Sequence, residues 1–173
     1  MVIGALILLG FASLGINHML ADKTTVMVEA EASLNATSIA QIMIDEAMKK
    51  AYDAATAGGV RIYDSTQFTP ANMLGPSSTE AANVGTLPDT SNPFRSDTYY
   101  NDVDDYNNYS RLVSTPIMGQ FTVVDTVCYL NETNLNLTAT TQTCYKRITV
   151  TVRHPNMSFP LQLSDVAVYR RYF

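Results

Sequence analysis

Acidic side chains are concentrated in one short stretch of the chain, residues 97–109. The segment NDVDDYNNY follows shortly after Asp97 and contributes Asp102, Asp104 and Asp105 among several asparagines. Oxygen ligands of this kind suit Ca²⁺, so the stretch predicts a calcium site formed by these carboxylates. It is not an EF-hand, because the turn glycine and the closing glutamate are missing. The alternative is a solvated acidic loop in which Asp and Asn side chains make local turns.

The chain has two cysteines, Cys128 and Cys144, and each lies in a predicted strand. A polar segment rich in Asn and Thr separates them, as expected for the connection of a hairpin. A disulfide between them would set the strand register and place Val124 opposite Ile148 on an apolar face. Such a bond is typical of an exported protein. Two free thiols in the core are the alternative, and no Cys or His spacing indicates a metal or haem site.

Five Asn-X-Ser/Thr sequons occur in the chain. Asn35 lies on a predicted helix and is a poor candidate for modification. The other four, Asn108, Asn131, Asn136 and Asn156, lie in the predicted outer part of the protein, where a glycan would be tolerated. The sequence therefore makes the protein a candidate glycoprotein.

No combination of residues that performs catalysis is recognisable. The chain lacks a GxSxG elbow, a glycine-rich phosphate loop and an HExxH helix. Its histidines, His18 and His154, lie at an apolar helix end and a strand end, and Asp104 and Asp105 are not expected in an apolar setting that would shift their pKa values. The net charge of -5 argues against a nucleic-acid partner. We expect neither an enzyme nor a cofactor apart from the predicted calcium ion.

These candidate residues follow one long N-terminal helix, which dominates the sequence. Met1 to Ala21 is an unbroken apolar run, and a helical pattern continues without proline to about Asp53. Such a helix is roughly 80 Å long, more than a membrane or a small domain can cover. The run lacks the basic start and the small-residue cleavage site of a secretory signal, so we expect it to be retained as an anchor. Met1 is then either the initiator or the first residue left after a leader was removed.

The second half of this helix, residues 22–57, carries a stripe of mostly small residues. The stripe recurs at spacings of three and four and comprises Val26, Ala30, Ser33, Thr37, Ala40, Ile44, Ala47 and Ala51. Ile39, Ile42 and Met43 are expected on the far side. One face would pack on the chain's own domain and the other on a second subunit. The alternative is an ordinary buried helix in a monomer. Gly58 and Gly59 are expected to end the helix.

Residues 58–173 are expected to form one outer domain. Pro, Ser, Thr and Asn dominate residues 64–110, which predicts a long surface loop region. Alternating Val, Ile, Thr and Tyr predict strands near residues 111–117, 120–130, 143–154 and 160–170. An antiparallel meander of these strands laid on the stripe gives an α+β fold in two parts, the helix of residues 1–57 and the outer domain.

Together these features resemble the type IV filament superfamily, the type IV pilins and type II secretion pseudopilins. The resemblance rests on the apolar start of the helix, on ATSIAQIMIDEAMKKAYD, which is similar to the family's AxxxAQxxIEE-like segment, and on the strand-rich domain with its expected disulfide. It implies a basic leader removed by a prepilin peptidase, and helices that pack in the core of a helical filament. Ala5 stands where pilins generally carry a glutamate, which implies a divergent filament, such as an archaeal one, or a minor pseudopilin.

The expected function is that of a structural subunit of an extracellular type IV pilus-like filament, inserted in the membrane before assembly. Its partners would be further copies of itself, the membrane and the filament assembly machinery. The residues expected to make polymerisation contacts are Met1, Gly4, Ala5, Leu8, Phe11, Leu14, Ile39, Ile42 and Met43. The alternative is a membrane-anchored binding module, or a minor pseudopilin of a secretion system, whose acidic loop binds calcium or a glycan.

Overall fold

The computed structural model describes the backbone of residues 2–170, with the side chains of Lys23 and of residues 26–170. Its helices and strands are α1 (Val2–Met48), α2 (Ser78–Val84), α3 (Arg95–Tyr99), β1 (Ser110–Thr115), β2 (Gly119–Tyr129), β3 (Tyr145–Arg153) and β4 (Leu161–Val168). The short 3-10 helices are η1 (Ala54–Gly59), η2 (Ser65–Gln67), η3 (Ala71–Met73) and η4 (Asp104–Tyr106). The predicted strands are thus present within the described chain, with ends that differ by one or two residues from those expected.

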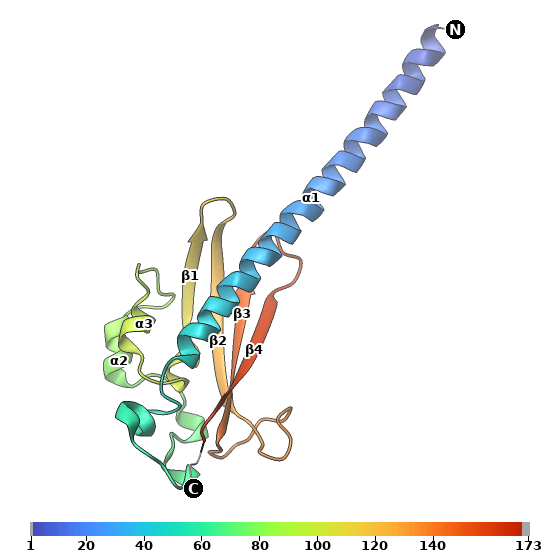
Figure 1. Ribbon diagram of the computed structural model, residues 1–173. Coiled ribbons are helices and arrows are strands. Elements are labelled where there is room, and N and C mark those ends of the chain that lie inside the picture. Colours follow the sequence, from blue (N-terminus) through green and yellow to red (C-terminus); the bar gives the residue numbers. More distant parts are fainter. Residues whose placement is uncertain (1, 171–173) are drawn as a thin grey trace.

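The strands form an antiparallel sheet in the order β1-β2-β3-β4, so that each strand pairs with its neighbour in sequence. Figure 1 shows α1 lying across one face of this sheet and continuing beyond its end as a single rod. The predicted α+β fold is confirmed: residues 26–48 of the helix pack against a four-stranded antiparallel sheet in a pilin-like arrangement. Alternate residues of β2 and β3 point toward α1 and are buried, as the two-residue period of a strand requires.

The face of α1 that packs on the sheet is lined mainly by alanine. Its buried apolar residues recur at helical spacing and are Ala32, Ala36, Ile39, Ala40, Met43, Ile44 and Ala47. Small side chains let the helix approach the sheet closely, while Met43 and Ile44 fill the space between them. The predicted stripe is therefore confirmed at Ala40, Ile44 and Ala47, and it is wrong before them, because Val26, Ala30 and Thr37 are exposed. Ala51, the last predicted member, lies beyond the end of α1.

Two of the residues predicted on the far side of the helix belong to the core. Ile39 and Met43 are 8% and 0% exposed, whereas Ile42 is 63% exposed. The prediction was wrong for the first two because the buried arc of α1 lies further round the helix than the stripe that begins at Val26. Each of them follows a buried alanine by three positions, a spacing that returns to the same helix face.

The long helix ends earlier than the sequence predicts, at Met48 rather than near Asp53. Asp53 instead caps η1, accepting a hydrogen bond from the backbone N–H of Ala55 at 3.1 Å. Gly58 and Gly59, with φ of 76° and 83°, end η1 and not α1. The break leaves the backbone after α1 free to pair with the acidic segment that contains Asp102.

Much of the region predicted as surface loop is ordered by one buried carboxylate. Asp89 accepts hydrogen bonds from the backbone N–H groups of Ser91 and Arg95, each at 2.9 Å, and from the hydroxyl of Tyr109, also at 2.9 Å. Figure 1 shows α2 and α3 held beside β1, at one edge of the sheet. The short helices of this region are consequently fixed against the domain that α1 also joins.

Candidate assembly surface and its supporting charge clusters

The N-terminal half of α1 extends past the sheet, and no other segment of the described chain lies beside it (Figure 1). Met1 is outside the described residues, and only the backbone is described for the further predicted polymerisation residues Gly4, Ala5, Leu8, Phe11 and Leu14. At about 1.5 Å per residue, the backbone from Val2 to Lys23 is roughly 30 Å long. Among the described residues, no helix combines the length and the apolar character that crossing a membrane requires.

An apolar stripe remains open on the outer side of α1. Met27, Leu34 and Ile42 are 71%, 72% and 63% exposed. They are spaced by seven and eight positions, which brings them onto one side of a helix and away from the alanines that face the sheet. We call these three residues the outer stripe. Of the residues predicted to make polymerisation contacts, Ile42 lies on this surface, whereas Ile39 and Met43 do not.

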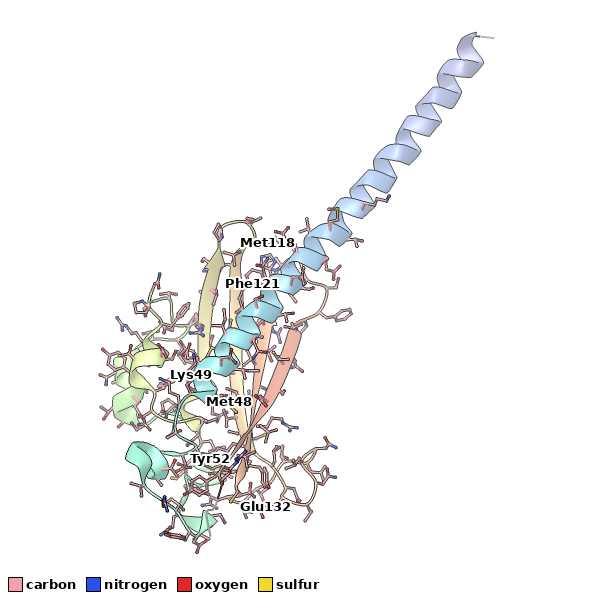
Figure 2. All side chains as sticks on the ribbon, viewed as in Figure 1. Met48, Lys49, Tyr52, Met118, Phe121 and Glu132 are labelled. Atoms are coloured by element: carbon pink, nitrogen blue, oxygen red, sulfur yellow. The ribbon has the colours of Figure 1, made fainter. Side chains whose placement is uncertain are left out.

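A groove of about 340 Å³ lies beside the outer stripe, between the C-terminal part of α1 and the segment that leads into α3. Its walls are Ile42, Asp45, Glu46, Lys49, Asn92, Pro93, Phe94 and Asp97. Figure 2 places Lys49 at the C-terminal end of α1, close to Met48. The groove thus connects Ile42 of the outer stripe to Pro93 and Phe94 of the outer domain, and its other walls are polar or charged.

The end of the sheet from which α1 emerges carries two further exposed apolar side chains. Ile117, between β1 and β2, is 81% exposed, and Phe159, between β3 and β4, is 82% exposed. The second of these connections also touches the helix, because the backbone N–H of Ser158 donates a hydrogen bond to Glu29 at 3.1 Å. The loops that flank the emerging helix are therefore apolar at their tips.

A buried ion pair joins α1 to the sheet behind the groove. Arg111 on β1 donates a hydrogen bond to Glu46 on α1 at 2.8 Å, and the Arg111 guanidinium lies 4.1 Å from the centre of the Phe94 ring. The other oxygen of Glu46 accepts hydrogen bonds from Ser96 at 2.7 Å and Tyr106 at 2.9 Å. Breaking a buried pair of this kind typically costs about 3–5 kcal/mol.

Asp125 lies in the same buried layer, and its side chain accepts no hydrogen bond from the described residues. Both of its carboxylate oxygens and Nε of Arg111 lack a hydrogen-bond partner among the described residues. Burial raises the pKa of Asp125 well above its usual value, although the charge of Arg111 acts in the opposite direction. A carboxyl group in such a position is destabilising unless it keeps its proton.

A second buried cluster surrounds Lys146 on β3. The Lys146 ammonium donates to Asp53 at 2.8 Å and to the carbonyl of Tyr52 at 2.9 Å, and it forms an ion pair with Asp104. The cluster lies where the chain leaves α1, near the Tyr52 that Figure 2 labels, and its lysine is 0% exposed. Lys146, Arg111 and Glu46 were not among the residues singled out from the sequence.

The predicted calcium site is not formed by the described residues. Asp97 is exposed on α3 and pairs with Lys50 at 3.6 Å, apart from the other three carboxylates. Asp102 accepts hydrogen bonds from the backbone N–H groups of Asp104 and Asp105, and Asp105 accepts them from those of Asn101 and Asp102. No group of three or more His, Cys, Asp or Glu side chains in the described part of the chain is arranged to hold a metal ion. These carboxylates are occupied by N–H donors and are buried, not solvated.

The burial of this segment also contradicts the expected ordinary acidity of its carboxyl groups. Desolvation raises the pKa of Asp102 to about 9, helped by a hydrogen bond to the side chain of Asp104 and by the charges of its neighbours. Desolvation likewise raises the pKa of Asp105 to about 6, against the effect of its backbone N–H donors. These carboxyl groups are buried because Val103, Tyr106 and Tyr109 of the same stretch pack in the core.

The predicted disulfide is absent, since Cys128 and Cys144 are both free. In the observed register Cys128 pairs with Arg147 and Val124 with Thr151, three positions away from the expected pairing. A shift by an odd number of residues moves side chains to opposite faces of a sheet. The cause is the segment between the strands, which makes its own bridge between Leu130 and Thr138 before β3 begins.

The predicted glycosylation sites differ in accessibility. Asn108, Asn136 and Asn156 are exposed. Asn131 is half-buried, and its side-chain oxygen accepts hydrogen bonds from the backbone N–H and the hydroxyl of Thr133 at 2.9 and 2.7 Å. Modification of any of the four stays a prediction.

No protein-family model, curated protein or solved structure matches this chain. The function must therefore be argued from the residues and contacts described above.

Proposed function

We propose that this protein is a structural subunit of an extracellular filament of the type IV kind, which polymerises through the N-terminal half of α1. The observation that carries the proposal is the shape of α1: it is one helix of 47 residues, its residues 26–48 pack on the sheet, and its N-terminal half extends past the sheet (Figure 1). The unpacked half has the apolar sequence that begins at Val2 and ends at Ala21. An apolar helix with no neighbour would expose its whole surface to water, so it needs a partner.

In this proposal the apolar half of α1 occupies two environments, one after the other. Before assembly the apolar half lies in the membrane, and during assembly it leaves the lipid to pack among the same helices of other copies. Both environments are dry, so the gain comes from close helix packing, which Gly4, Ala5, Gly10, Ala12 and Gly15 favour. The proposal thus includes the membrane, an assembly machinery and a leader peptidase as partners, and other copies of the chain as the final one.

The outer stripe supports contacts between subunits beyond the membrane segment. Met27, Leu34 and Ile42 are large apolar side chains whose burial would each contribute about 1.5–3 kcal/mol if covered completely. They lie on the side of α1 that the chain's own sheet leaves open. In the proposed filament they pack against a neighbouring copy.

The membrane-anchored binding module is the weaker candidate. It was based on an acidic loop with free carboxylates, whereas Asp102, Asp104 and Asp105 are buried and bonded within the chain. A module of this kind would also leave the outer stripe exposed to water without a use.

The test replaces a residue of the outer stripe with a charged one. Leu34→Glu and Ile42→Glu are expected to abolish filaments in electron micrographs of material sheared from cells, because a buried glutamate without a partner is costly. Met73→Glu is the matched control: Met73 is 67% exposed on η3, outside the stripe. Circular dichroism of each variant in detergent checks that the fold is kept. Filaments that form normally with both stripe variants would refute the role of this surface, and wild-type cells without filaments would refute the proposed function.

A further inference from the structure

The Lys146 cluster places an amine and a carboxyl group in contact in a site closed to water. Lys146 is 0% exposed, and the side chains of Asp53 and Asp104 are 1% and 2% exposed. The ammonium also lies 4.6 Å from the ring centre of Tyr52 and 5.2 Å from that of Tyr129. An ion pair alone would account for these contacts. The same contacts also hold together an amine and a carboxyl group, which are the two groups that form an amide.

The carboxyl groups around Lys146 differ in protonation. Asp102 keeps its proton at neutral pH, because burial and its hydrogen bond to the Asp104 side chain raise its pKa to about 9. Burial acts against ionisation of Asp53, but the charge of Lys146 and the N–H donors of Thr69 and Ala55 hold its pKa below the usual value. One neighbour of the reacting pair can thus donate a proton and the other can accept one.

We propose that Lys146 and Asp104 condense within the folded protein to form an amide cross-link between β3 and η4. Nζ of Lys146 adds to Cγ of Asp104, the new C–N bond forms, and a C–O bond of the carboxyl group breaks. Of the three protons on the Lys146 ammonium, one stays on the amide nitrogen and two leave with the Asp104 oxygen as water. Asp53 and Asp102 relay these protons and end in their starting states. No oxidant, reductant or external group takes part.

The arrangement favours condensation over the reverse reaction. Reacting groups held together by a fold behave as if present at effective concentrations of roughly 10⁵–10⁸ M. The aromatic rings and the complete burial of Lys146 keep bulk water away from the product. Asp104 is preferred over Asp53 as the acceptor, because its carboxyl group is the one that Asp102 protonates and hydrogen-bonds.

The cross-link would tie β3 to η4 across 42 residues of sequence, and the chain just before η4 pairs with the segment that follows α1 through the bridge between Ala51 and Asp102. A covalent bond at that point resists separation of the helix end from the sheet. The inference does not depend on filament assembly and holds for the monomer as well.

Mass spectrometry of the wild-type full chain, expressed in a host without N-glycosylation and digested with trypsin after denaturation, tests the proposal. The expected product joins the peptide of residues 96–111, which contains Asp104, to that of residues 112–147, with a mass lower than their sum by one water. Trypsin should not cleave after Lys146, since an amide removes the charge it recognises. Cleavage after Lys146 together with unmodified peptides would overturn the proposal, and so would a link to the Asp53 peptide of residues 51–61.

Two comparisons show whether the fold directs the reaction. Lys50 and Asp97 form a partly exposed pair at 3.6 Å and serve as an internal control, which should remain unlinked and cleavable. Asp102→Asn keeps an acceptor oxygen for the backbone N–H of Asp104 but removes the acidic proton, so the cross-linked fraction should fall at least tenfold. A fraction equal to that of the wild type would contradict the role of Asp102 and the proposed mechanism.

Discussion

Replacing the fully buried Asp125 by valine is expected to stabilise the protein. Both of its carboxylate oxygens lack hydrogen-bond partners, and it lies on β2 between Val123 and Val127 on the face toward α1. An unsatisfied buried polar group costs about 1–3 kcal/mol. Asp125→Val removes that cost and adds apolar contact. The variant should therefore gain roughly 2 kcal/mol, or about 4–8 °C in Tm for a chain of this size.

Asp89 provides the matched comparison, because it is the same residue type with nearly the same burial. Asp89 is 2% exposed and Asp125 is 0% exposed. Asp89 accepts four hydrogen bonds, from two backbone N–H groups and from the hydroxyls of Ser91 and Tyr109. Asp89→Val leaves these donors, of which the Tyr109 hydroxyl is buried, without their acceptor and should lower the free energy of unfolding by about 3–5 kcal/mol. The same change from aspartate to valine is thus expected to raise the free energy of unfolding at position 125 and to lower it at position 89.

The assay is thermal unfolding of the full chain in detergent, followed by near-ultraviolet circular dichroism of its ten tyrosines, since the protein has no tryptophan. A pH series adds a second test. The raised pKa of Asp125 means that the folded protein holds this proton, whereas the unfolded chain loses it near the usual aspartate pKa of 3.8. The contribution of the Asp125 proton to stability is complete below that pH and is lost as the pH rises. The stability of Asp125→Val should therefore fall less than that of the wild type over the same rise in pH. If Asp125→Val lowered Tm as Asp89→Val does, the reasoning would be refuted.

Two further predictions concern the buried ion pair and the cysteines. Arg111→Met should lower the free energy of unfolding in urea by about 3–5 kcal/mol, because Glu46 is left buried without its cation. Adding Glu46→Gln to the same chain should recover part of the loss. A loss below about 1 kcal/mol for Arg111→Met alone would contradict this account of the pair. Titration with a thiol reagent in denaturant without reductant should find two thiols per chain, from Cys128 and Cys144. A value near zero would show that the two cysteines form a disulfide, in contradiction to the observed strand register.

The arrangement of helix and strands was predictable because their patterns are local. The alternation along KRITVTVR, for example, identifies β3 and its buried face without knowledge of any partner. The same alternation could have revealed the buried lysine, since Lys146 shares the face of Ile148, Val150 and Val152. Asp125 shares the face of its buried valine neighbours in the same way. A charged residue in phase with buried ones is thus a usable sequence signal of a buried charge.

The partners of these charged residues could not have been predicted in that way. Lys146 meets Asp104 across 42 residues and Asp53 across 93, and nothing local at either aspartate specifies the contact. The calcium prediction failed for the same reason, because a lysine from a distant strand neutralises the acidic segment. The disulfide prediction failed because the register depends on the turn structure of residues 131–142, whereas only the cysteine positions were used.

The position of the two charge clusters bears on how the proposed filament holds its subunits together. The face of α1 on the sheet is rich in alanine, which permits close approach but provides few large side chains to oppose sliding of the helix. The directional contacts lie at the C-terminal end of α1 and just after it, at the Glu46–Arg111 pair and at the Asp53–Lys146 pair. A pull on the protruding half of the helix would therefore be resisted mainly at these two points. This is also where the proposed Lys146–Asp104 amide would add a bond that ordinary unfolding cannot break.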